Sequence, residues 1–184
     1  MEYDFAQCFE KLSGVAHKVD SEKAAAEKIA TICQEQDAKC IALAGLTESL
    51  VSQIEASCSG MTILKEPYAS NELPGAIDKA DLGITGIAFA MAQSGTMVEV
   101  TTNDANRLVS SLPRTHIGIL QAEDIVDKYH DGSQRMREVT AQHDSNLVIT
   151  FISGPSRTGD IELILSLGVH GPASCHAVII DNQN

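Results

Sequence analysis

The chain has 184 residues, of which 43% are hydrophobic, only 4% are aromatic and none is tryptophan. This size favours one domain whose core is built from Ala, Val, Ile and Leu. Its 25 acidic and 13 basic residues give a formal net charge of −12, which argues against nonspecific binding to nucleic acid or to an anionic membrane. No apolar run approaches the roughly 20 residues that span a bilayer. The acidic N-terminus is unlike a signal peptide, so we expect a cytoplasmic protein.

Five cysteines are scattered through the chain, at positions 8, 33, 40, 58 and 175, and no two form a C-x-x-C pair. The odd number and the spacing argue against a disulfide framework. The spacing is also unsuited to an iron–sulfur cluster held by this chain itself. Zinc binding by Cys175 with His170 and His176 lacks the usual ligand spacing. We therefore expect free thiols and no metal site.

The first forty residues have helical character. Residues 5–18 carry apolar side chains at helical spacing, with a break in the middle, and residues 20–36 form a longer run of good helix formers that Ser21 can cap. We therefore expect an N-terminal helical extension over residues 1–38, followed by the main domain over residues 39–184.

In the main domain, short apolar runs alternate with helical ones. The expected strands are 40–45, 61–66, 81–85, 96–102, 115–121, 145–153 and 176–181. The expected helices are 47–57, 86–95, 122–143 and 156–168. Such alternation predicts an α/β fold with a mostly parallel sheet and helices on both faces. Functional loops are then expected beyond the carboxyl ends of the strands.

A candidate anion site follows the expected strand 145–153. A Gly-Pro turn at 154–155 leads into the expected helix, whose first amides have no intrahelical partners and whose dipole adds partial positive charge. Arg157 adds a full charge and a bidentate donor set. Turn, helix start and arginine together predict a phosphate or carboxylate site over residues 154–160.

An ordinary helix start explains the same residues. Ser156 or Thr158 can serve only as the helix cap, and Asp160 or Glu162 can pair with Arg157 and neutralise its charge. From the pattern alone, both interpretations stay open.

Further polar loops lie between residues 83 and 119. A hydroxyl-lined turn at 94–96 precedes one expected strand, and a polar loop at 103–107 follows it. If these strands are parallel neighbours of the strand at 145–153, the loops converge on one edge of the sheet. Turns rich in Ser, Gly, Thr and Asn are also common without any function.

Two histidines could act as acids or bases, although a structural role is more common for such residues. His116 opens an expected strand, and His170 lies in a loop just past an expected helix. The neighbours Cys175 and His176 invite comparison with a nucleophile and its base. Because adjacent strand residues point to opposite faces, these two side chains are not expected to share one reaction.

Three segments together resemble the LUD-domain (lactate utilization) family, of the LutC/YkgG type. They read ADLGITGIAFAMAQSGTMVEV, NRLVSSLPRTHIGIL and FISGPSRTGDIELILSLGVHGP, and they cover most of residues 80–181. The specific combination is a Ser-Gly-Thr turn, then Leu-Pro-x-x-His-Ile, then Gly-Pro-Ser-Arg-Thr-x-Asp-Ile-Glu. The first eighty residues match only loosely.

The resemblance implies a fold of the NagB/RpiA/CoA-transferase-like class and a part in oxidising L-lactate to pyruvate. It also implies LutA-like and LutB-like partner proteins that carry the iron–sulfur clusters, with no cofactor held by this chain and a small anion as ligand. A homodimer through the N-terminal helices stays an open alternative.

Two positions depart from the family pattern: Gln93 stands where a Glu is usual, and Gly159 where an Ala is usual. The family supplies no catalytic residue for this chain, so only binding candidates are carried over. They are Ser94, Gly95, Thr96, Asn106, Arg107, His116, Gly154, Ser156, Arg157, Thr158, Asp160, Glu162 and His170. The main alternative function is a stand-alone enzyme or sensor that binds a phosphorylated metabolite, a nucleotide or a CoA ester. A purely structural assembly protein is a third possibility.

Overall fold

The structure is a computed structural model that describes residues 1–69, 71, 73–143, 147–159 and 165–182. Its centre is a six-stranded sheet in which all neighbouring strands are parallel. In spatial order the strands are β1 (Val15–Val19), β12 (Ser174–Ile180), β7 (Thr115–Gln121), β4 (Leu82–Gly86), β2 (Cys40–Ala44) and β3 (Thr62–Lys65). Their apolar runs suit a parallel sheet, which is covered on both faces. The predicted α/β class is confirmed.

A second, smaller sheet packs over one face of the main sheet. In spatial order its strands are β8 (Ile125–Val126), β5 (Phe89–Met91), β6 (Thr96–Thr101) and β9 (Val148–Ile152). Strand β6 is antiparallel to both of its neighbours, whereas β5 and β8 are parallel. Apolar side chains of both sheets fill the space between them, together with Phe5 and Phe9 of α1 (Phe5–Glu10).

Helices cover both faces of the main sheet, as the alternating pattern predicts. On one face, α2 (Glu22–Glu35) and α3 (Glu48–Ser57) share a core with β2, β4 and β7. On the other face, α4 (Asp104–Ser111) packs on β2, β4 and β7 beside the second sheet. Helix α5 (Tyr129–Thr140) covers the outer face of that sheet. Two 3-10 turns complete the elements, η1 (Ile77–Lys79) and η2 (Ala122–Asp124).

Side-chain caps begin helices α1 to α4, and the first of them is Asp4, which accepts from the Gln7 amide at 3.0 Å. The predicted cap Ser21 accepts a hydrogen bond from the Ala24 amide at 3.2 Å, so that prediction is confirmed. Thr47 and Asn103 cap α3 and α4 in the same way. Each cap satisfies an amide that has no partner within its helix. Among the described residues, no helix is long and apolar enough to cross a bilayer.

The N-terminal segment is not entirely helical. Residues 15–19 form β1, an edge strand of the main sheet that pairs in parallel with β12. The prediction of a helix through residues 5–18 is therefore wrong after α1 ends at Glu10. The chain changes from helix to strand near Gly14. Ser13 has a left-handed φ of 68°, which does not allow the helix to continue. Segment 1–38 thus contributes a strand to the sheet of the main domain.

The predicted helix 86–95 is also wrong. This stretch contains β5 and the turn that joins it to β6, with Gly95 in a left-handed conformation (φ 56°). Both faces of β5 are buried, one against the main sheet and the other against α5. A short run that is apolar on every side has no periodicity that separates a strand from a helix.

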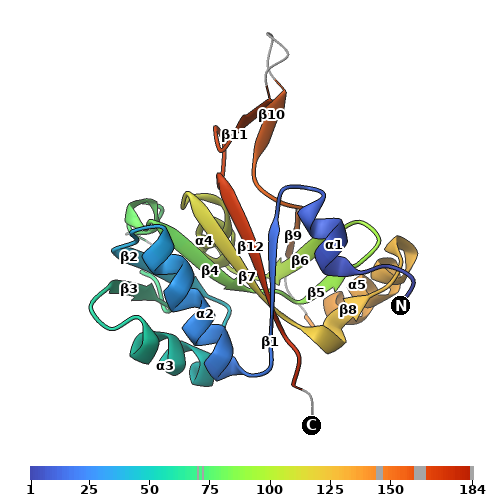
Figure 1. Ribbon diagram of the computed structural model, residues 1–184, viewed down its shortest axis with the longest axis horizontal. Helices are drawn as coiled ribbons and strands as arrows, with labels where there is room; N and C mark the ends of the chain where they lie inside the picture. Colours follow the sequence, from blue (N-terminus) through green and yellow to red (C-terminus); the bar gives the residue numbers. More distant parts are fainter. Residues whose placement is uncertain (70, 72, 144–146, 160–164, 183–184) are drawn as a thin grey trace.

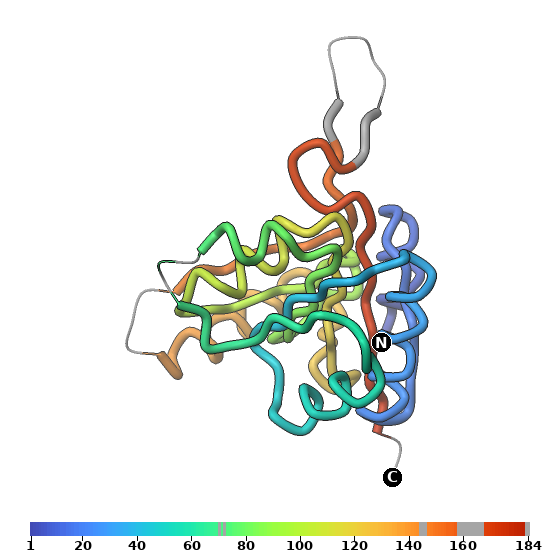
Figure 2. The backbone as a smooth tube through the Cα atoms, turned by 90° about the vertical axis from the view of Figure 1, so that its left-hand side faces the viewer, coloured from blue at the N-terminus to red at the C-terminus, as the bar shows by residue number. Residues whose placement is uncertain are grey.

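The described parts of the predicted helix 156–168 are strands instead. They form an antiparallel hairpin of β10 (Arg157–Gly159) and β11 (Leu165–Leu167), which projects away from the two sheets (Figures 1 and 2). In the sequence, residues 161, 163, 165 and 167 are Ile or Leu, a period of two that is typical of a strand. The helix prediction overlooked this alternation.

Candidate functional site

The base of the projecting hairpin joins three loops at the amino edge of the main sheet. The Ser156 amide donates to the Pro172 carbonyl at 2.8 Å, and the Gly168 amide donates to the Ser156 carbonyl at 2.9 Å. The Ala173 amide donates to the Arg114 carbonyl at 2.7 Å, just before β7 and β12 begin. The loop that begins at Gly154 therefore lies at the amino edge of the main sheet. Functional loops were expected at the other edge, where the strands have their carboxyl ends.

Two arginines and a histidine lie at this hairpin base. Arg114, Arg157 and His170 are all exposed, and neither arginine forms an ion pair with an acid in the described part of the chain. In a chain with a net charge of −12, these side chains form a local group of exposed cations or potential cations. Arg114 was not among the predicted residues, although it lies within the Leu-Pro-x-x-His segment.

The described residues of this region contain no helix of the kind on which the anion prediction rested. Residues 157–159 are strand β10, so neither free helix amides nor a helix dipole point at a ligand here. An anion at this place would depend on the side-chain charges of the two arginines and on nearby amides. Asp160 and Glu162, which could neutralise Arg157, lie outside the described residues. Thr158 is placed in β10 by its backbone only.

The turn at 94–96 lies close to the start of the motif loop. The Thr96 hydroxyl is 2.9 Å from the Ser153 hydroxyl and also donates to the Ser94 carbonyl at 3.2 Å. A Cβ at Gly154 would lie 2.6 Å from the Leu12 carbonyl oxygen, so this loop passes directly over the segment that follows α1. The structure therefore brings the Ser-Gly-Thr turn and the Gly-Pro turn together through the antiparallel pairing of β6 and β9. The expected convergence of all the polar loops through parallel strands is wrong, because the 103–107 loop lies at the other end of β6.

His116 is fully buried between the two sheets. Its Nε2 lies 2.9 Å from the Thr85 hydroxyl, and its Nδ1 lies 3.8 Å from the Cys175 sulfur. Desolvation, and then the nearby His176, lower the pKa of His116 to about 3. Burial raises the pKa of the Cys175 thiol to about 12. The pair is therefore neutral near pH 7, unlike a thiolate activated by an imidazolium.

Cys175 and His176 do point to opposite faces, as predicted. Cys175 joins the core between the sheets, whereas His176 Nδ1 lies 3.2 Å from His17 Nε2 on the other face. The histidine that meets Cys175 is His116, its register partner on the adjacent strand. This cross-strand pair has no signal in the spacing of the sequence.

A buried carboxyl group lies near the same histidine. Glu99 on β6 has no exposed surface and accepts a hydrogen bond from the Ser110 hydroxyl of α4 at 2.9 Å. Burial raises its pKa, while the hydroxyls of Ser110 and Thr85 partly oppose that shift. A series of buried polar groups thus connects α4, the second sheet and the main sheet. Its members are Ser110, Glu99, Thr85, His116 and Cys175. The sequence analysis did not identify Glu99. The one feature that could have indicated it is an acidic residue at an inward-facing position of an alternating strand.

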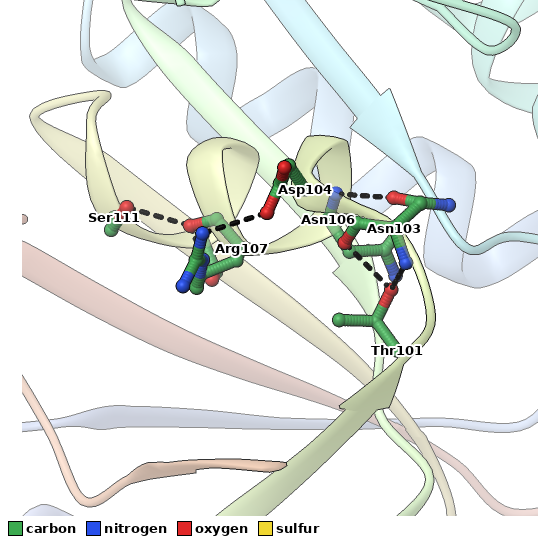
Figure 3. A network of polar contacts seen from close by, with 7 residues as sticks. Thr101, Asn103, Asp104, Asn106, Arg107 and Ser111 are labelled. Atoms are coloured by element: carbon green, nitrogen blue, oxygen red, sulfur yellow. Dashed lines mark hydrogen bonds and ion pairs between the residues drawn. The ribbon is translucent and has the colours of Figure 1, made fainter. Parts of the chain in front are cut away.

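Asn106 lies in the first turn of α4 and Arg107 near the middle of the helix (Figure 3), whereas the hairpin base lies near the last residue of the helix, Ser111. Asn103 caps the first turn and accepts from the Asn106 amide at 3.1 Å. Arg107 Nη2 donates to Asp104 at 2.7 Å, so its charge is compensated. Asn106 is only 6% exposed and faces a cleft at the carboxyl ends of β2 and β4. The predicted candidates therefore divide between two ends of the molecule and its interior.

The described features define the class of protein: an α/β domain in which a six-stranded parallel sheet is combined with a smaller mixed sheet and a projecting hairpin. The model of the LUD domain matches residues 3–180. The chain belongs to the LUD-domain family, as the three motif segments predicted.

Relatives and a solved structure agree with this assignment. The "Lactate utilization protein C" of Shouchella clausii (strain KSM-K16) is 36% identical over 104 residues, covering 56% of this chain and 45% of that protein. The same-named protein of Exiguobacterium sp. (strain ATCC BAA-1283 / AT1b) is 38% identical over 117 residues, covering 62% and 49%. The match thus spans about half the length of these relatives. A crystal structure of a DUF162 family protein from Deinococcus radiodurans has a similar fold, with a TM-score of 0.63, 20% identity and coverage of 96% and 93%.

Proposed function

We propose that this chain acts in lactate utilization, as the cluster-free subunit of a system that oxidises L-lactate to pyruvate. The observation that carries the proposal is membership of the LUD-domain family, together with relatives named lactate utilization protein C. In this proposal LutA-like and LutB-like proteins hold the iron–sulfur clusters, and the assembly works in the cytoplasm.

The placement of the cysteines supports the assignment of the iron–sulfur clusters to partner proteins. The five thiols lie on α1, α2, β2, the end of α3 and β12, and Cys33, Cys58 and Cys175 are buried. A four-cysteine cluster needs thiolates that converge on one point. In the described part of the chain, no group of three or more His, Cys, Asp or Glu side chains is placed to hold a metal. Electron transfer would then depend on clusters in partner proteins.

The proposal includes an anion site at the hairpin base, with Arg157 and Arg114 as its charged groups. Both guanidinium groups are exposed, Arg114 just before β7 and Arg157 at the start of β10, and both segments are hydrogen-bonded to residues 172–173. Arginine recognises carboxylates through two parallel hydrogen bonds, which suits lactate, pyruvate or an acidic partner surface. Ser156 directly precedes Arg157, and His170 lies on the loop between β11 and β12, so both could contribute further donors.

The alternative is a stand-alone enzyme or sensor that binds a phosphorylated metabolite, a nucleotide or a CoA ester. It predicts turnover or regulation by the pure chain, without partner proteins. The buried His116–Cys175 pair gives this alternative little support, because neither group is ionised near pH 7 and neither is accessible.

The experiment is removal of this protein from its native host, followed by measurement of lactate:dye oxidoreductase activity and gentle affinity purification of the tagged wild type. We expect the activity to fall and the tagged chain to be recovered with iron–sulfur proteins. Size-exclusion chromatography of the same sample also tests for the homodimer. Recovery of the chain alone, with unchanged lactate oxidation after its removal, would refute the proposal.

A further inference from the structure

Three polar side chains lie in a row on the face of the main sheet that α2 covers. The hydroxyl of Ser174, the first residue of β12, lies 2.9 Å from His176 Nε2. On the other side of the same ring, His176 Nδ1 lies 3.2 Å from Nε2 of His17 on β1. Both separations are within hydrogen-bond distance. The imidazole of His176 therefore links the other two side chains.

The alternation of strand residues explains this arrangement. Ser174 and His176 are two positions apart on β12, so their side chains leave the same face of the sheet. Val178 and Ile180, the next residues in phase, belong to the core beneath α2 and α3. His17 is a diagonal neighbour of His176, because its register partner on β12 is Val178. Two strands that are distant in sequence thus bring the three side chains together.

The two imidazole rings are oriented for a single hydrogen bond. Their centroids are 5.4 Å apart, further than the facing nitrogens, and their planes differ by only 10°, so the rings meet edge to edge. With the proton assigned to Nδ1, His176 donates to His17, and its Nε2 is left to accept from the Ser174 hydroxyl. This tautomer satisfies all three side chains, and it is the one in which Nε2 can take a proton from a hydroxyl.

The order of these atoms is that of a nucleophile, a general base and an orienting group. In serine hydrolases the histidine accepts the hydroxyl proton through Nε2, and an acid holds its Nδ1–H. Here His17 takes the place of the acid. Among the described residues, no carboxylate forms a hydrogen bond or an ion pair with either of these two rings. A neutral histidine orients the base but stabilises its protonated form less than a carboxylate does, so turnover is expected to be slow.

The exposure of the three side chains suits the same roles. His176 is only 7% exposed, whereas Ser174 and His17 are half-buried. Ser174 begins β12 at the amino edge of the sheet, where its amide donates to the Arg114 carbonyl at 3.2 Å. The base is therefore shielded from water, while the residue that carries the hydroxyl reaches the surface.

Burial also sets the strength of the base. Desolvation, and then the nearby His17, lower the pKa of His176 to about 4. Its ring is therefore neutral at pH 7 and free to accept a proton. Because proton transfer to a weak base is less effective, only esters with a good leaving group are expected to react at a measurable rate.

We propose that these residues form a hydrolytic site for carboxylic esters, with Ser174 as nucleophile, His176 as general base and His17 as positioning residue. The Ser174 oxygen bonds to the acyl carbon while its proton passes to His176 Nε2, and the leaving alcohol departs with that proton. Water then attacks the acyl carbon and gives a proton to His176, which returns it to Ser174 as the acid is released. This activity goes beyond the proposed role in lactate oxidation, because it needs no electron acceptor and no partner protein.

The test is hydrolysis of p-nitrophenyl acetate by the purified full chain, together with labelling by a fluorophosphonate, a reagent that phosphonylates activated serines. We expect hydrolysis above the buffer rate and a label that peptide mass spectrometry locates on Ser174. Ser174→Ala and His176→Gln should each prevent the labelling and lower kcat/KM roughly a hundredfold. Ser133→Ala removes an exposed serine of α5 and is the matched control, which should behave as the wild type does.

Two variants of His17 separate a positioning role from a structural one. His17→Leu should lower kcat about tenfold with little change in KM, because the base loses the acceptor that orients it. His17→Gln should keep most of the wild-type rate, since its amide oxygen can accept from Nδ1 in place of the ring nitrogen. Circular dichroism of each variant verifies that it is folded, and Ser174→Ala removes only a hydroxyl from a half-buried position.

Three results would overturn the proposal. The first is a folded wild type that neither hydrolyses the ester nor takes up the label. The second is hydrolysis or labelling that persists in Ser174→Ala, which would assign the reaction to another nucleophile such as the half-buried Cys8. The third is an equal rate for His17→Leu and His17→Gln, which would show that His17 does not orient the base.

Discussion

At the scale of single residues, surroundings decide what a side chain can do. His116 and Cys175 have the chemical identities of a catalytic pair and are in contact, yet desolvation keeps both neutral. Burial also raises the pKa of the Glu99 carboxyl, so this group keeps its proton to a higher pH than an exposed glutamate does. These groups therefore join the two sheets through buried hydrogen bonds. The arginines at the hairpin base, by contrast, are exposed and form no ion pair with an acid in the described part of the chain.

Loss of either exposed arginine should weaken the stabilisation of the protein by anions. A ligand present at about a hundred times its Kd stabilises the native state by roughly 2.7 kcal/mol, which raises Tm by about 5–10 °C in a chain of this size. We expect such a shift with at least one of phosphate, sulfate, L-lactate or pyruvate. Arg157→Ala and Arg114→Ala should each reduce it by more than half in a thermal-shift assay.

Arg137→Ala is the matched control, because that arginine is exposed on α5 on the outer side of the second sheet. It should respond to the anions as the wild type does. Equal responses from the wild type and both hairpin-base variants would show that these arginines do not bind the anion.

At the scale of elements, the sequence was most informative where a run had one clear period. Strands β2, β7 and β12 and the capped helix α2 were all expected near their observed positions. Strand β5 was missed because burial on both faces removes any periodicity. The short edge strand β1 depends on long-range pairing with β12, which lies about 160 positions away and leaves no local signal.

The candidate site was harder to predict than the fold, for a related reason. The candidate loop at 154–160 was proposed from its residues, but its setting was inferred from a helix, whereas the described residues after Ser156 form the two strands of a hairpin. The register of parallel strands, which brings Arg114 next to Ala173 and His116 next to Cys175, is set by tertiary packing. Asn106 was named as a candidate, but the cleft that it faces depends on how β2 and β4 diverge.

The projecting hairpin can be removed to separate its function from the fold. The Gly168 amide bonds to the Ser156 carbonyl, so the two ends of the hairpin are already joined at its base. Replacement of residues 157–167 by Gly-Gly should change the free energy of unfolding by less than about 1 kcal/mol, as for other surface changes. Urea denaturation measures this change.

The same deletion should abolish recovery of iron–sulfur partner proteins in the affinity purification, if the hairpin base is the contact surface. A drop in stability of several kcal/mol would instead show that the hairpin is part of the core. Normal recovery of the partners from a stable deletion variant would place their contact elsewhere on the chain.

At the scale of the whole molecule, charge is distributed unevenly. The net charge is −12, and acidic side chains such as Glu22, Glu48 and Glu66 surround the carboxyl edge of the main sheet. The exposed cations Arg114 and Arg157 lie at its amino edge. Helix α4 runs between the two edges, with Asn106 near one end and Ser111 near the other. The two edges of the main sheet thus differ in charge and are joined by helix α4.

Acid should destabilise this protein before its carboxylates are fully protonated. Desolvation, and then the nearby His17, lower the pKa of His176 to about 4, and the pKa of His116 is about 3. In the unfolded chain both histidines bind a proton near pH 6.5, whereas the folded protein keeps them neutral until a lower pH. The unfolded state therefore binds more protons in this range, and stability is lost as the pH falls from about 6.5 toward 4.

The variant His176→Gln removes one of these groups and should flatten the fall in stability. One pKa unit corresponds to about 1.4 kcal/mol, so His176 alone accounts for a loss on the order of 2–3 kcal/mol between pH 7 and pH 4. Urea denaturation at several pH values measures the slope for the wild type, for His176→Gln and for His143→Gln, an exposed histidine that serves as the control. The control should follow the wild type. Equal slopes for all three proteins would mean that the buried histidines do not cause the acid sensitivity, and that the carboxylates dominate instead.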